Sequence, residues 1–378
     1  MSKFSRPRNL VRLATLMVTI GLLAVGLAAC GNPTPTSVPA TAVSSTTTAS
    51  NPPVTTTAVT TAASTTNAAT TAVSATTTAI GVLPAGRPPN GVLPQMGSTI
   101  SINPTFKDLA YASVSATEKL DIYLPSGNGP FPLVVFFHPG GFMMGDKAMD
   151  QSGFDTLLSN GYAIASVNYR LSAEAKFPAQ IYDAKAAIRF LRANATSYKI
   201  DADHIAAWGA SAGGNLAALV GTSGGVADLE GTTLGNAEVS SKVQAVVDWF
   251  GPIDFLQMDT QFAQTTSCGV SAQTHSTANS PESQLLGGAV SQKADLAKAA
   301  SPITYITSDD APFFIEHGTA DCNIPPVQGQ ELANALSSVI GANKVTLKYI
   351  EGAGHGGPQF FTSENMSLVI QFLDKYMK

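Results

Sequence analysis

The chain has 378 residues and a formal net charge of −5 at pH 7. Residues 13–86 contain no Asp, Glu, Lys or Arg, and a compact domain needs charged residues on its surface, so this stretch is not expected to form one. From residue 98 onward the composition is globular, and these roughly 280 residues suit a single domain with a well-buried core. Beyond the N-terminus the chain has no cluster of basic residues, so its charge pattern does not indicate a surface that binds nucleic acid.

The N-terminal segment has the pattern of an export signal. An apolar stretch over residues 13–27 follows four basic residues: Lys3, Arg6, Arg8 and Arg12. It ends in the small residues Ala28 and Ala29, directly before Cys30. A secretory signal requires a basic start, an apolar stretch and small residues at the cleavage site.

A Cys in that place resembles the lipobox of bacterial lipoproteins. The resemblance implies a signal peptide over residues 1–29, a lipid attached to Cys30, and a catalytic domain held outside the cytoplasm at the outer face of the cell membrane. Two alternatives stay open. One is an uncleaved anchor helix, although the apolar run is short for a membrane span. The other is an ordinary signal with an incidental Cys.

Residues 30–97 are a low-complexity tract rich in Thr, Ala, Ser and Pro. Each block of ten residues between 41 and 80 contains four Thr, and Thr-Ala-Val-Ser occurs at both 41 and 71. Without large apolar side chains such a segment cannot offset its chain entropy, which predicts a disordered linker. Its composition fits a stalk with O-linked glycans, and an adhesive role is the alternative.

The elements predicted for residues 98–378 alternate between strands and helices. Half-exposed strands are predicted over 120–124 and 345–350, and buried strands over 133–137, 162–167, 204–208, 243–249 and 312–316. Helices are predicted over 178–195, 327–340 and 364–376. This alternation predicts a mostly parallel sheet with helices on both faces. The interval of about 255–300 breaks the rhythm and is a candidate lid.

Gly209-Ala210-Ser211-Ala212-Gly213 is the strongest local motif. It follows the strand that ends at Trp208 and precedes a helical stretch over 214–220, the context that a nucleophile elbow requires. Small residues suit the strained backbone of such a serine and the close approach of its neighbours. The helix that follows directs its N-terminal N–H groups at the place where negative charge develops.

The base and acid are expected after the serine, with the acid first. Among five histidines, His355 lies in a Gly-rich loop after the strand over 345–350, which is the place that the base needs. For the acid the sequence favours Asp321, just after the strand over 312–316. Asp254 and Asp248 are the alternatives, and Asp254 also fits a turn cap.

The chain has three cysteines: Cys30, Cys268 and Cys322. If Cys30 carries a lipid, the other two remain as a pair in an oxidising compartment, where a disulfide persists. Their spacing is not a metal signature. Two alternatives remain. Cys268 and Cys322 form a disulfide that would fasten the lid to the acid loop, or they are two separate buried thiols.

These motifs carry a family resemblance once His138-Pro139-Gly140-Gly141-Phe142 is included. Residues 118–378 resemble the α/β-hydrolase superfamily, its esterase/lipase branch with an HGGG-type loop, and within that branch the acetyl-xylan and feruloyl esterase-like group. Three further stretches are similar to that group: Asn168-Tyr169-Arg170-Leu171, Phe177-Pro178-Ala179-Gln180 with Asp183, and Gly318-Thr319-Ala320-Asp321. The resemblance implies the α/β-hydrolase fold.

The resemblance also implies an oxyanion hole formed by the N–H groups of Gly140, Gly141 and Ala212. Pro139 departs from the family pattern because it stands where the first Gly is expected and has no N–H. The donors are the following two glycines, so the hole is not expected to be lost. Without the resemblance, the His138 segment would read as a simple Gly-rich turn.

The function expected on this basis is serine ester hydrolysis through an acyl-enzyme, with His355 as base, Asp321 as its orienting acid and no metal or organic cofactor. Short-acyl or aromatic-acyl esters, including those linked to polysaccharide, are the expected substrates. Phe142, Phe177 and the 255–300 interval are expected to shape the pocket. A peptidase or amidase of arylformamidase type, and a catalytically silent lipoprotein that binds glycans, are the alternatives.

Overall fold

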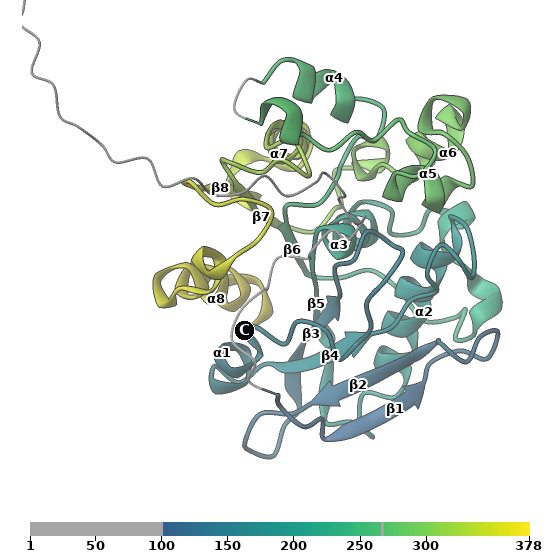
Figure 1. The fold of residues 1–378 in the computed structure, drawn as a ribbon. Helices are drawn as coiled ribbons and strands as arrows, with labels where there is room; N and C mark the ends of the chain where they lie inside the picture. The colour runs from purple at the N-terminus through teal and green to yellow at the C-terminus, as the bar shows by residue number, and fades with distance from the viewer. Residues whose placement is uncertain (1–100, 266–267) are drawn as a thin grey trace, which may run out of the picture. The chain divides into compact units, whose positions relative to one another are not determined.

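The structure is a computed structural model that describes residues 101–265 and 268–378 (Figure 1). The predicted signal peptide over 1–29, the lipidation of Cys30 and the predicted linker over 30–97 lie outside the described residues. Within the described part of the chain, no helix is long and apolar enough to cross a membrane.

The described residues build one sheet with the strand order β1-β2-β4-β3-β5-β6-β7-β8. The strands are β1 (Phe106–Ala110), β2 (Lys119–Tyr123), β3 (Phe131–Phe137), β4 (Ala163–Val167), β5 (Ile200–Ala210), β6 (Ala245–Trp249), β7 (Phe313–Gly318) and β8 (Val345–Ile350). β2 pairs antiparallel with β1 and β4, and the other neighbours are parallel. The mostly parallel sheet of the α/β-hydrolase fold, predicted from the sequence, is confirmed.

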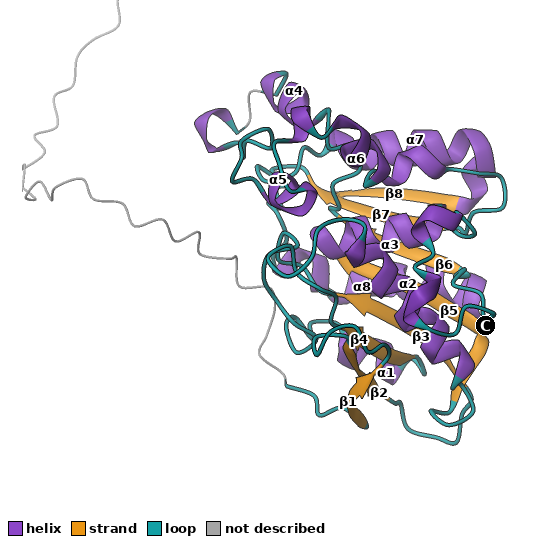
Figure 2. Ribbon diagram, turned by 90° about the vertical axis from the view of Figure 1, so that its right-hand side faces the viewer, coloured by secondary structure: helices purple, strands orange, loops and turns teal. Residues whose placement is uncertain are grey.

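Helices cover both faces of this sheet (Figure 2). One face packs against α2 (Ala179–Ala193), α3 (Ala212–Thr222) and α7 (Val327–Ile340), and the other against α1 (Phe154–Ser159) and α8 (Ser363–Met377). Alternate residues of β3 belong to the two different cores, because successive side chains of a strand point to opposite faces. Short 3-10 helices lie in the loops: η1 (Ala227–Leu229), η2 (Thr232–Leu234), η5 (Pro302–Tyr305), η6 (Ala342–Lys344) and η7 (Pro358–Phe361).

The segment over 255–300, which we call the insertion, lies between β6 and β7. Its described part contains α4 (Met258–Ala263), η3 (Gly269–Ser271), α5 (Pro281–Leu286), η4 (Val290–Gln292) and α6 (Ala294–Ala299). α5 begins as a capped helix, because the Ser280 side chain accepts the N–H of Ser283 and Pro281 occupies the first turn. Over 255–300, these short helices interrupt the alternation of strands and helices, as the sequence predicted.

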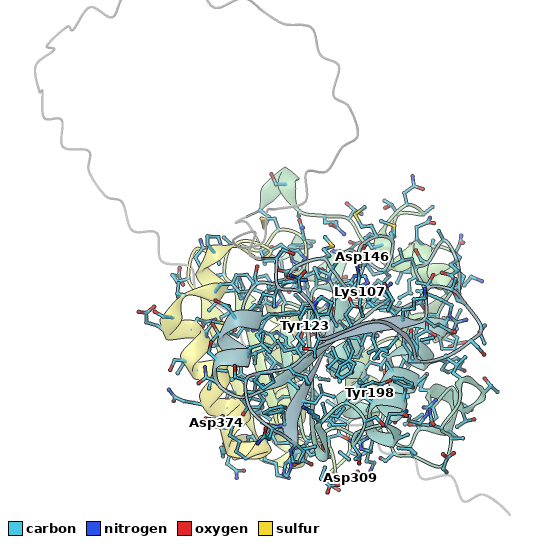
Figure 3. The ribbon with its side chains drawn as sticks, turned by 90° about the horizontal axis from the view of Figure 1, so that it is seen from below. Lys107, Tyr123, Asp146, Tyr198, Asp309 and Asp374 are labelled. Atoms are coloured by element: carbon cyan, nitrogen blue, oxygen red, sulfur yellow. A yellow bond between two sulfur atoms is a disulfide. The ribbon has the colours of Figure 1, made fainter. Side chains whose placement is uncertain are left out.

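The sequence misjudged the antiparallel edge of the sheet. The strand predicted as half-exposed over 120–124 is β2, whose last four residues are all buried. Asp121 is buried because its carboxylate binds the Lys147 ammonium at 2.7 Å and accepts the N–H of Asp108 at 2.6 Å. β1 was not predicted at all. Figure 3 shows side chains packed around the sheet, with the charged Asp309 and Asp374 at the periphery.

Candidate active site

The carboxyl ends of the parallel strands form the floor of the site. From β3 the chain continues to β4 on one side, and β5 lies on the other side of β3. The loops after these strands therefore diverge, and such a switch point in an open α/β sheet leaves a crevice where ligands bind. The loops after β3, β5, β7 and β8 carry all the residues that the sequence assigned to catalysis and oxyanion binding.

Ser211 lies on a sharp turn between β5 and α3. Its backbone has φ 56° and ψ −121°, an unusual conformation for a residue with a side chain. Its N–H donates to the Trp249 carbonyl at 2.8 Å. A Cβ at Gly213 would lie 1.9 Å from the Phe137 carbonyl oxygen, so only glycine fits there. The close packing of the turn against β3 and β6 thus holds Ser211 in its strained conformation.

Two short contacts connect Ser211, His355 and Asp321. The His355 Nε2 lies 2.8 Å from the Ser211 Oγ, and its Nδ1 lies 2.8 Å from the Asp321 Oδ2. The ring of Phe250 packs edge-on against the imidazole, with 4.8 Å between ring centroids. The three residues therefore stand in the geometry in which a base can remove the serine proton while a carboxylate fixes its tautomer.

Asp321 is almost completely buried, with 1% of its surface exposed. Its Oδ1 accepts the N–H groups of Asn323 and Ile324 at 2.8 and 3.0 Å. Burial alone would raise the pKa of this carboxyl, but the charge of His355 and a hydrogen bond from His317 hold it well below its usual range. The group is therefore an anion over the whole working range of pH.

The two alternative acids point elsewhere. Asp254 accepts the N–H of Leu256 at 3.0 Å and thus caps a turn. Asp248 is fully buried on β6, where its Oδ1 accepts the N–H of Gly251 at 3.0 Å. Neither is among the partners of His355.

The loop after β3 brings two predicted oxyanion donors to the pocket beside Ser211. Gly140 has φ 128°, and a Cβ there would lie 2.0 Å from the Met144 carbonyl oxygen. Within the described part of the chain, no group accepts the N–H of Gly140 or Gly141. Ala212 is the first residue of α3, where backbone N–H groups lack intrahelical partners. All three residues line the same pocket as Ser211.

His138 supports this loop from inside. It is 1% exposed and stacks on the Tyr169 ring at 4.3 Å between centroids. The His138 Nδ1 lies 2.8 Å from the Pro139 carbonyl oxygen, and the Tyr169 hydroxyl donates a hydrogen bond to the His138 carbonyl at 2.8 Å. Burial lowers the pKa of His138 to about 4, so the ring is neutral. These contacts give His138 a role in holding the loop.

The pocket is lined by both apolar and polar side chains. Met143, Met144 and Met149, from the loop after β3, are among the apolar ones. Phe142 and the insertion contribute to the lining as expected, the insertion through Gln273, Pro281 and Glu282. Phe177 does not line the pocket, which corrects the expectation: it is buried in the core that packs α2, and its N–H donates to the Leu285 carbonyl. Sequence motifs gave no signal for four further lining residues: Phe250, Pro252, Asn323 and Ile324.

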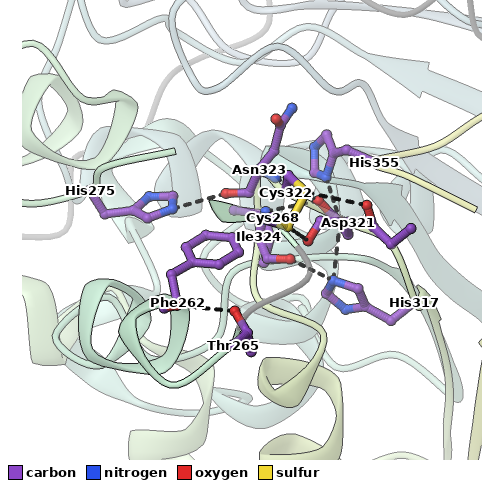
Figure 4. The surroundings of a disulfide bond; sticks show 11 residues. Phe262, Thr265, Cys268, His275, His317, Asp321, Cys322, Asn323, Ile324 and His355 are labelled. Carbon is purple, nitrogen blue, oxygen red and sulfur yellow. Dashed lines mark hydrogen bonds and ion pairs between the residues drawn. A yellow bond between two sulfur atoms is a disulfide. The ribbon is translucent and has the colours of Figure 1, made fainter. Parts of the chain in front are cut away.

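The insertion is tied to the loop that carries Asp321. Cys268 and Cys322 form a disulfide, one of the two alternatives that the sequence left open (Figure 4). The Gln273 N–H donates to the Cys322 carbonyl at 2.8 Å, and the His275 Nε2 lies 2.9 Å from the Asn323 carbonyl. A covalent bond and two polar contacts thus connect the two segments beside the acid.

A buried ion pair lies within the insertion, next to this connection. The His275 Nδ1 lies 2.9 Å from the Glu282 Oε2, and both side chains are at most 2% exposed. The contact is close but not aligned as a hydrogen bond. Burial alone would lower the pKa of His275, but the contact with Glu282 and the charges of Glu282 and Asp259 raise it above its usual value. The pair therefore favours the protonated form of His275.

The described residues contain no group of three or more His, Cys, Asp or Glu side chains placed to hold one metal ion.

The sheet topology and the relatives of the chain define its class, the proteins of the α/β-hydrolase fold, and the relatives below are named as esterases. Esterase LipC of Mycobacterium tuberculosis is 28% identical over 234 residues, which cover 60% of this chain and 53% of LipC. A solved structure titled as a truncated carbohydrate esterase from gut microbiota is 33% identical, with a TM-score of 0.66, over 75% of this chain and 99% of that one. The butyrate-bound esterase of Thermogutta terrifontis is 26% identical, with a TM-score of 0.57, over 71% of this chain and 94% of that one.

The family is narrower than this class. The sequence profile of the BD-FAE family matches residues 120–336, and the chain belongs to that family. The match begins in β2 and ends in α7, so it contains Ser211 and Asp321 but not His355. The chain spans about half the length of the curated relatives it matches.

Proposed function

We propose that this protein hydrolyses carboxylic esters with Ser211 as nucleophile, His355 as base and Asp321 as its orienting acid. The observation that carries the proposal is the pair of 2.8 Å contacts that run from the Ser211 Oγ through His355 to Asp321. They lie beside a pocket that Ser211 and His355 line.

The reaction follows from this geometry. His355 removes the Ser211 proton as the Oγ attacks the ester carbonyl carbon. Asp321 keeps the hydrogen on Nδ1 and stabilises the imidazolium. His355 then protonates the departing alcohol, which leaves an acyl group on Ser211. Water, deprotonated by the same imidazole, attacks this acyl group, and the bond to the Oγ breaks to release the carboxylic acid.

The oxyanion of each tetrahedral intermediate is assigned to the N–H groups of Gly140, Gly141 and Ala212. Two of these have no acceptor within the described part of the chain, and the third belongs to the first turn of α3. In comparable sites one such donor contributes about 3 kcal/mol to transition-state stabilisation. Helix α3 also directs its positive dipole end at the charge.

We propose short-acyl or aromatic-acyl esters of a hydroxylated alcohol, such as a polysaccharide, as substrates. The leaving alcohol must face the His355 Nε2, because that atom protonates it. We propose that the leaving alcohol contacts the polar side chains of Gln273 and Asn323 and that the acyl group contacts the methionines, all of which line the pocket. A relative titled as a carbohydrate esterase agrees with this assignment.

We also propose that the enzyme is exported and anchored to the outer face of the membrane through a lipid on Cys30. The basic, apolar and small residues before Cys30 support this, as does the Thr-rich tract that would serve as a spacer. A disulfide in the catalytic domain is of the kind that persists outside the cytoplasm. Labelling of the cells with a lipid precursor, compared with Cys30→Ala, tests the anchor. Equal labelling of both proteins would contradict it.

A panel of nitrophenyl esters from acetate to palmitate, together with methyl ferulate, tests the activity and the acyl preference. We expect turnover to fall as the acyl chain lengthens, and Ser211→Ala to abolish it. Equally slow hydrolysis of every ester by the wild type and by Ser211→Ala would contradict the proposed function.

A further inference from the structure

We infer that His317 is a positioning residue of the site: its Nε2–H, which donates to the Ile324 carbonyl, also lies beside the Asp321 carboxylate and thereby fixes the orientation and the basicity of the group that serves His355. This inference rests on the proposed function, since it concerns how the acid of that mechanism is held.

Two imidazoles converge on one carboxylate oxygen (Figure 4). His317 lies near the end of β7 and is fully buried. Its Nε2 lies 3.2 Å from the Asp321 Oδ2, the same oxygen that is 2.8 Å from the His355 Nδ1. The His317 Nε2 also lies 3.1 Å from the Ile324 carbonyl oxygen.

The surroundings of this Nε2 determine where the ring carries its hydrogen. Both neighbouring oxygens, the Asp321 carboxylate and the Ile324 carbonyl, are acceptors only. The His317 Nε2 must therefore carry a hydrogen, whatever the charge of the ring. The other nitrogen, Nδ1, has no hydrogen-bond partner within the described part of the chain. A neutral ring with its hydrogen on Nε2 donates to the Ile324 carbonyl and leaves only an acceptor unpaired.

His317 adds a polar N–H edge to the surroundings of Asp321. The Oδ1 accepts two backbone N–H groups and the Oδ2 accepts the N–H of His355, while the His317 Nε2, which donates to the Ile324 carbonyl, lies 3.2 Å from the same Oδ2. A buried carboxylate is stable as an anion only when its oxygens are hydrogen-bonded. Loss of the His317 donor would leave the Oδ2 more basic and freer to rotate. A more basic carboxylate binds the imidazolium form of His355 more strongly, so His355 would give up its proton only at higher pH.

Four elements lie against His317 and bring the groups that influence it, and on β8 the residue in register with His317 is Tyr349. The loop after β7 brings Asp321, and β6 brings Asp248, a buried carboxylate whose Oδ2 has no hydrogen-bond partner within the described residues. Burial raises the pKa of Asp248 to about 6. From α7, Gly329 approaches the ring so closely that a Cβ there would lie 3.4 Å from Nδ1. Asp248 is thus a titratable group, in addition to Asp321 and His355, whose charge can alter the electrostatic environment of His317.

The test is the pH profile of kcat/KM for the full chain with nitrophenyl acetate, for the wild type, His317→Phe and His317→Gln. Phe fills the space without a donor, whereas the Gln side-chain amide keeps one. We expect His317→Phe to lower kcat/KM about tenfold and to move the acidic limb upward by about one pH unit. His317→Gln should keep the acidic limb of the wild type. An unchanged limb in His317→Phe, or equal shifts in both variants, would overturn the inference.

A measurement on the wild type covers the case in which His317→Phe does not fold. In ¹⁵N-histidine NMR spectra of the full chain, His317 should carry its hydrogen on Nε2 between pH 5 and pH 9. A hydrogen on Nδ1 alone would contradict the inference without any reference to activity. The rate at which a fluorophosphonate labels Ser211 separates the two proposals. Absent labelling and absent ester turnover in the wild type would refute the proposed function, whereas normal labelling with a pH profile insensitive to His317 would refute only this inference.

Discussion

The catalytic loops and the insertion both line the pocket, but they are built differently. Ser211, His355 and Asp321 lie on loops that follow strands of the central sheet, of which β5 and β7 are largely buried and β8 is half-exposed. The insertion consists of short helices whose apolar side chains, such as Leu285 and Leu286, pack into the same core as α2 and α3, and one disulfide and two polar contacts tie it to the acid loop. We infer that the loops of the sheet carry the chemistry and that the insertion shapes the access of the substrate.

We expect the largest effects on kcat from changes to the catalytic residues on the loops that follow the strands. Ser211→Ala should lower kcat about a millionfold, because removal of the nucleophile in a comparable triad has an effect of this size. The backbone at this position is strained with either side chain, so the free energy of unfolding should stay within about 0.5 kcal/mol of the wild type. Steady-state kinetics and urea unfolding measure the two quantities. Residual turnover within tenfold of the wild type would refute the role of Ser211.

Asp321→Asn should lower kcat about 10⁴-fold, because an amide in place of the carboxylate leaves His355 with the wrong tautomer for accepting the serine proton. Asp254→Asn is the matched control. It changes the alternative acid in the same way and keeps an oxygen to cap its turn. We expect the control to retain kcat within about twofold. A loss in the control as large as in Asp321→Asn would move the acid to Asp254.

The disulfide tests how firmly the insertion is attached. The bridge closes a sequence separation of 54 residues, for which loop entropy corresponds to about 4 kcal/mol of stabilisation. Cys268→Ser with Cys322→Ser should lower the free energy of unfolding by up to this amount. Because the bridge lies next to Asp321, we also expect kcat/KM to fall by about tenfold. Reducing agent should reproduce both effects in the wild type and have none in the double variant. A wild type that loses neither stability nor activity on reduction would contradict this attachment.

The ion pair of the insertion predicts a smaller, pH-dependent effect. The pKa of His275 is raised in the folded protein above the value of 6.5 that it has when unfolded. The folded chain thus holds a proton that the unfolded chain releases first. The stabilisation is complete below about pH 6.5 and is lost as the pH rises through the raised pKa. Urea unfolding from pH 6 to pH 10 should show this decline, and Glu282→Gln, which lacks the anion, should show much less of it. Equal slopes for the two proteins would contradict it.

The same contrast separates what the sequence predicts from what it does not. The helix expected over 327–340 is α7 to the residue, and the buried strands were found because their apolar runs are periodic and local. The strand β2, which lies between β1 and β4, was misjudged because the burial of Asp121 depends on the remote Lys147, which neutralises its carboxylate. Glu282 gave no signal, since a single acidic residue in an irregular segment has no pattern. The position of Glu282 in the pocket depends on His275, seven residues earlier in the chain, and on the folded acid loop.

The site residues divide in the same manner. Ser211 and the His138 loop lie in contiguous motifs whose spacing reports local backbone geometry. Asp321 and His355 were selected by chain order. His317 could not be assigned to the site in this way, because its contact with Asp321 depends on how the loop after β7 turns back over the strand.

The most direct test of the central claim is the capture of the acyl-enzyme. Nitrophenyl acetate should give a rapid release of about one nitrophenol per chain, and mass spectrometry after an acid quench should find the acetyl group on Ser211. Ser211→Ala should give neither the burst nor the adduct. Ester turnover without any adduct, or an acetyl group on another residue that persists in Ser211→Ala, would contradict the account.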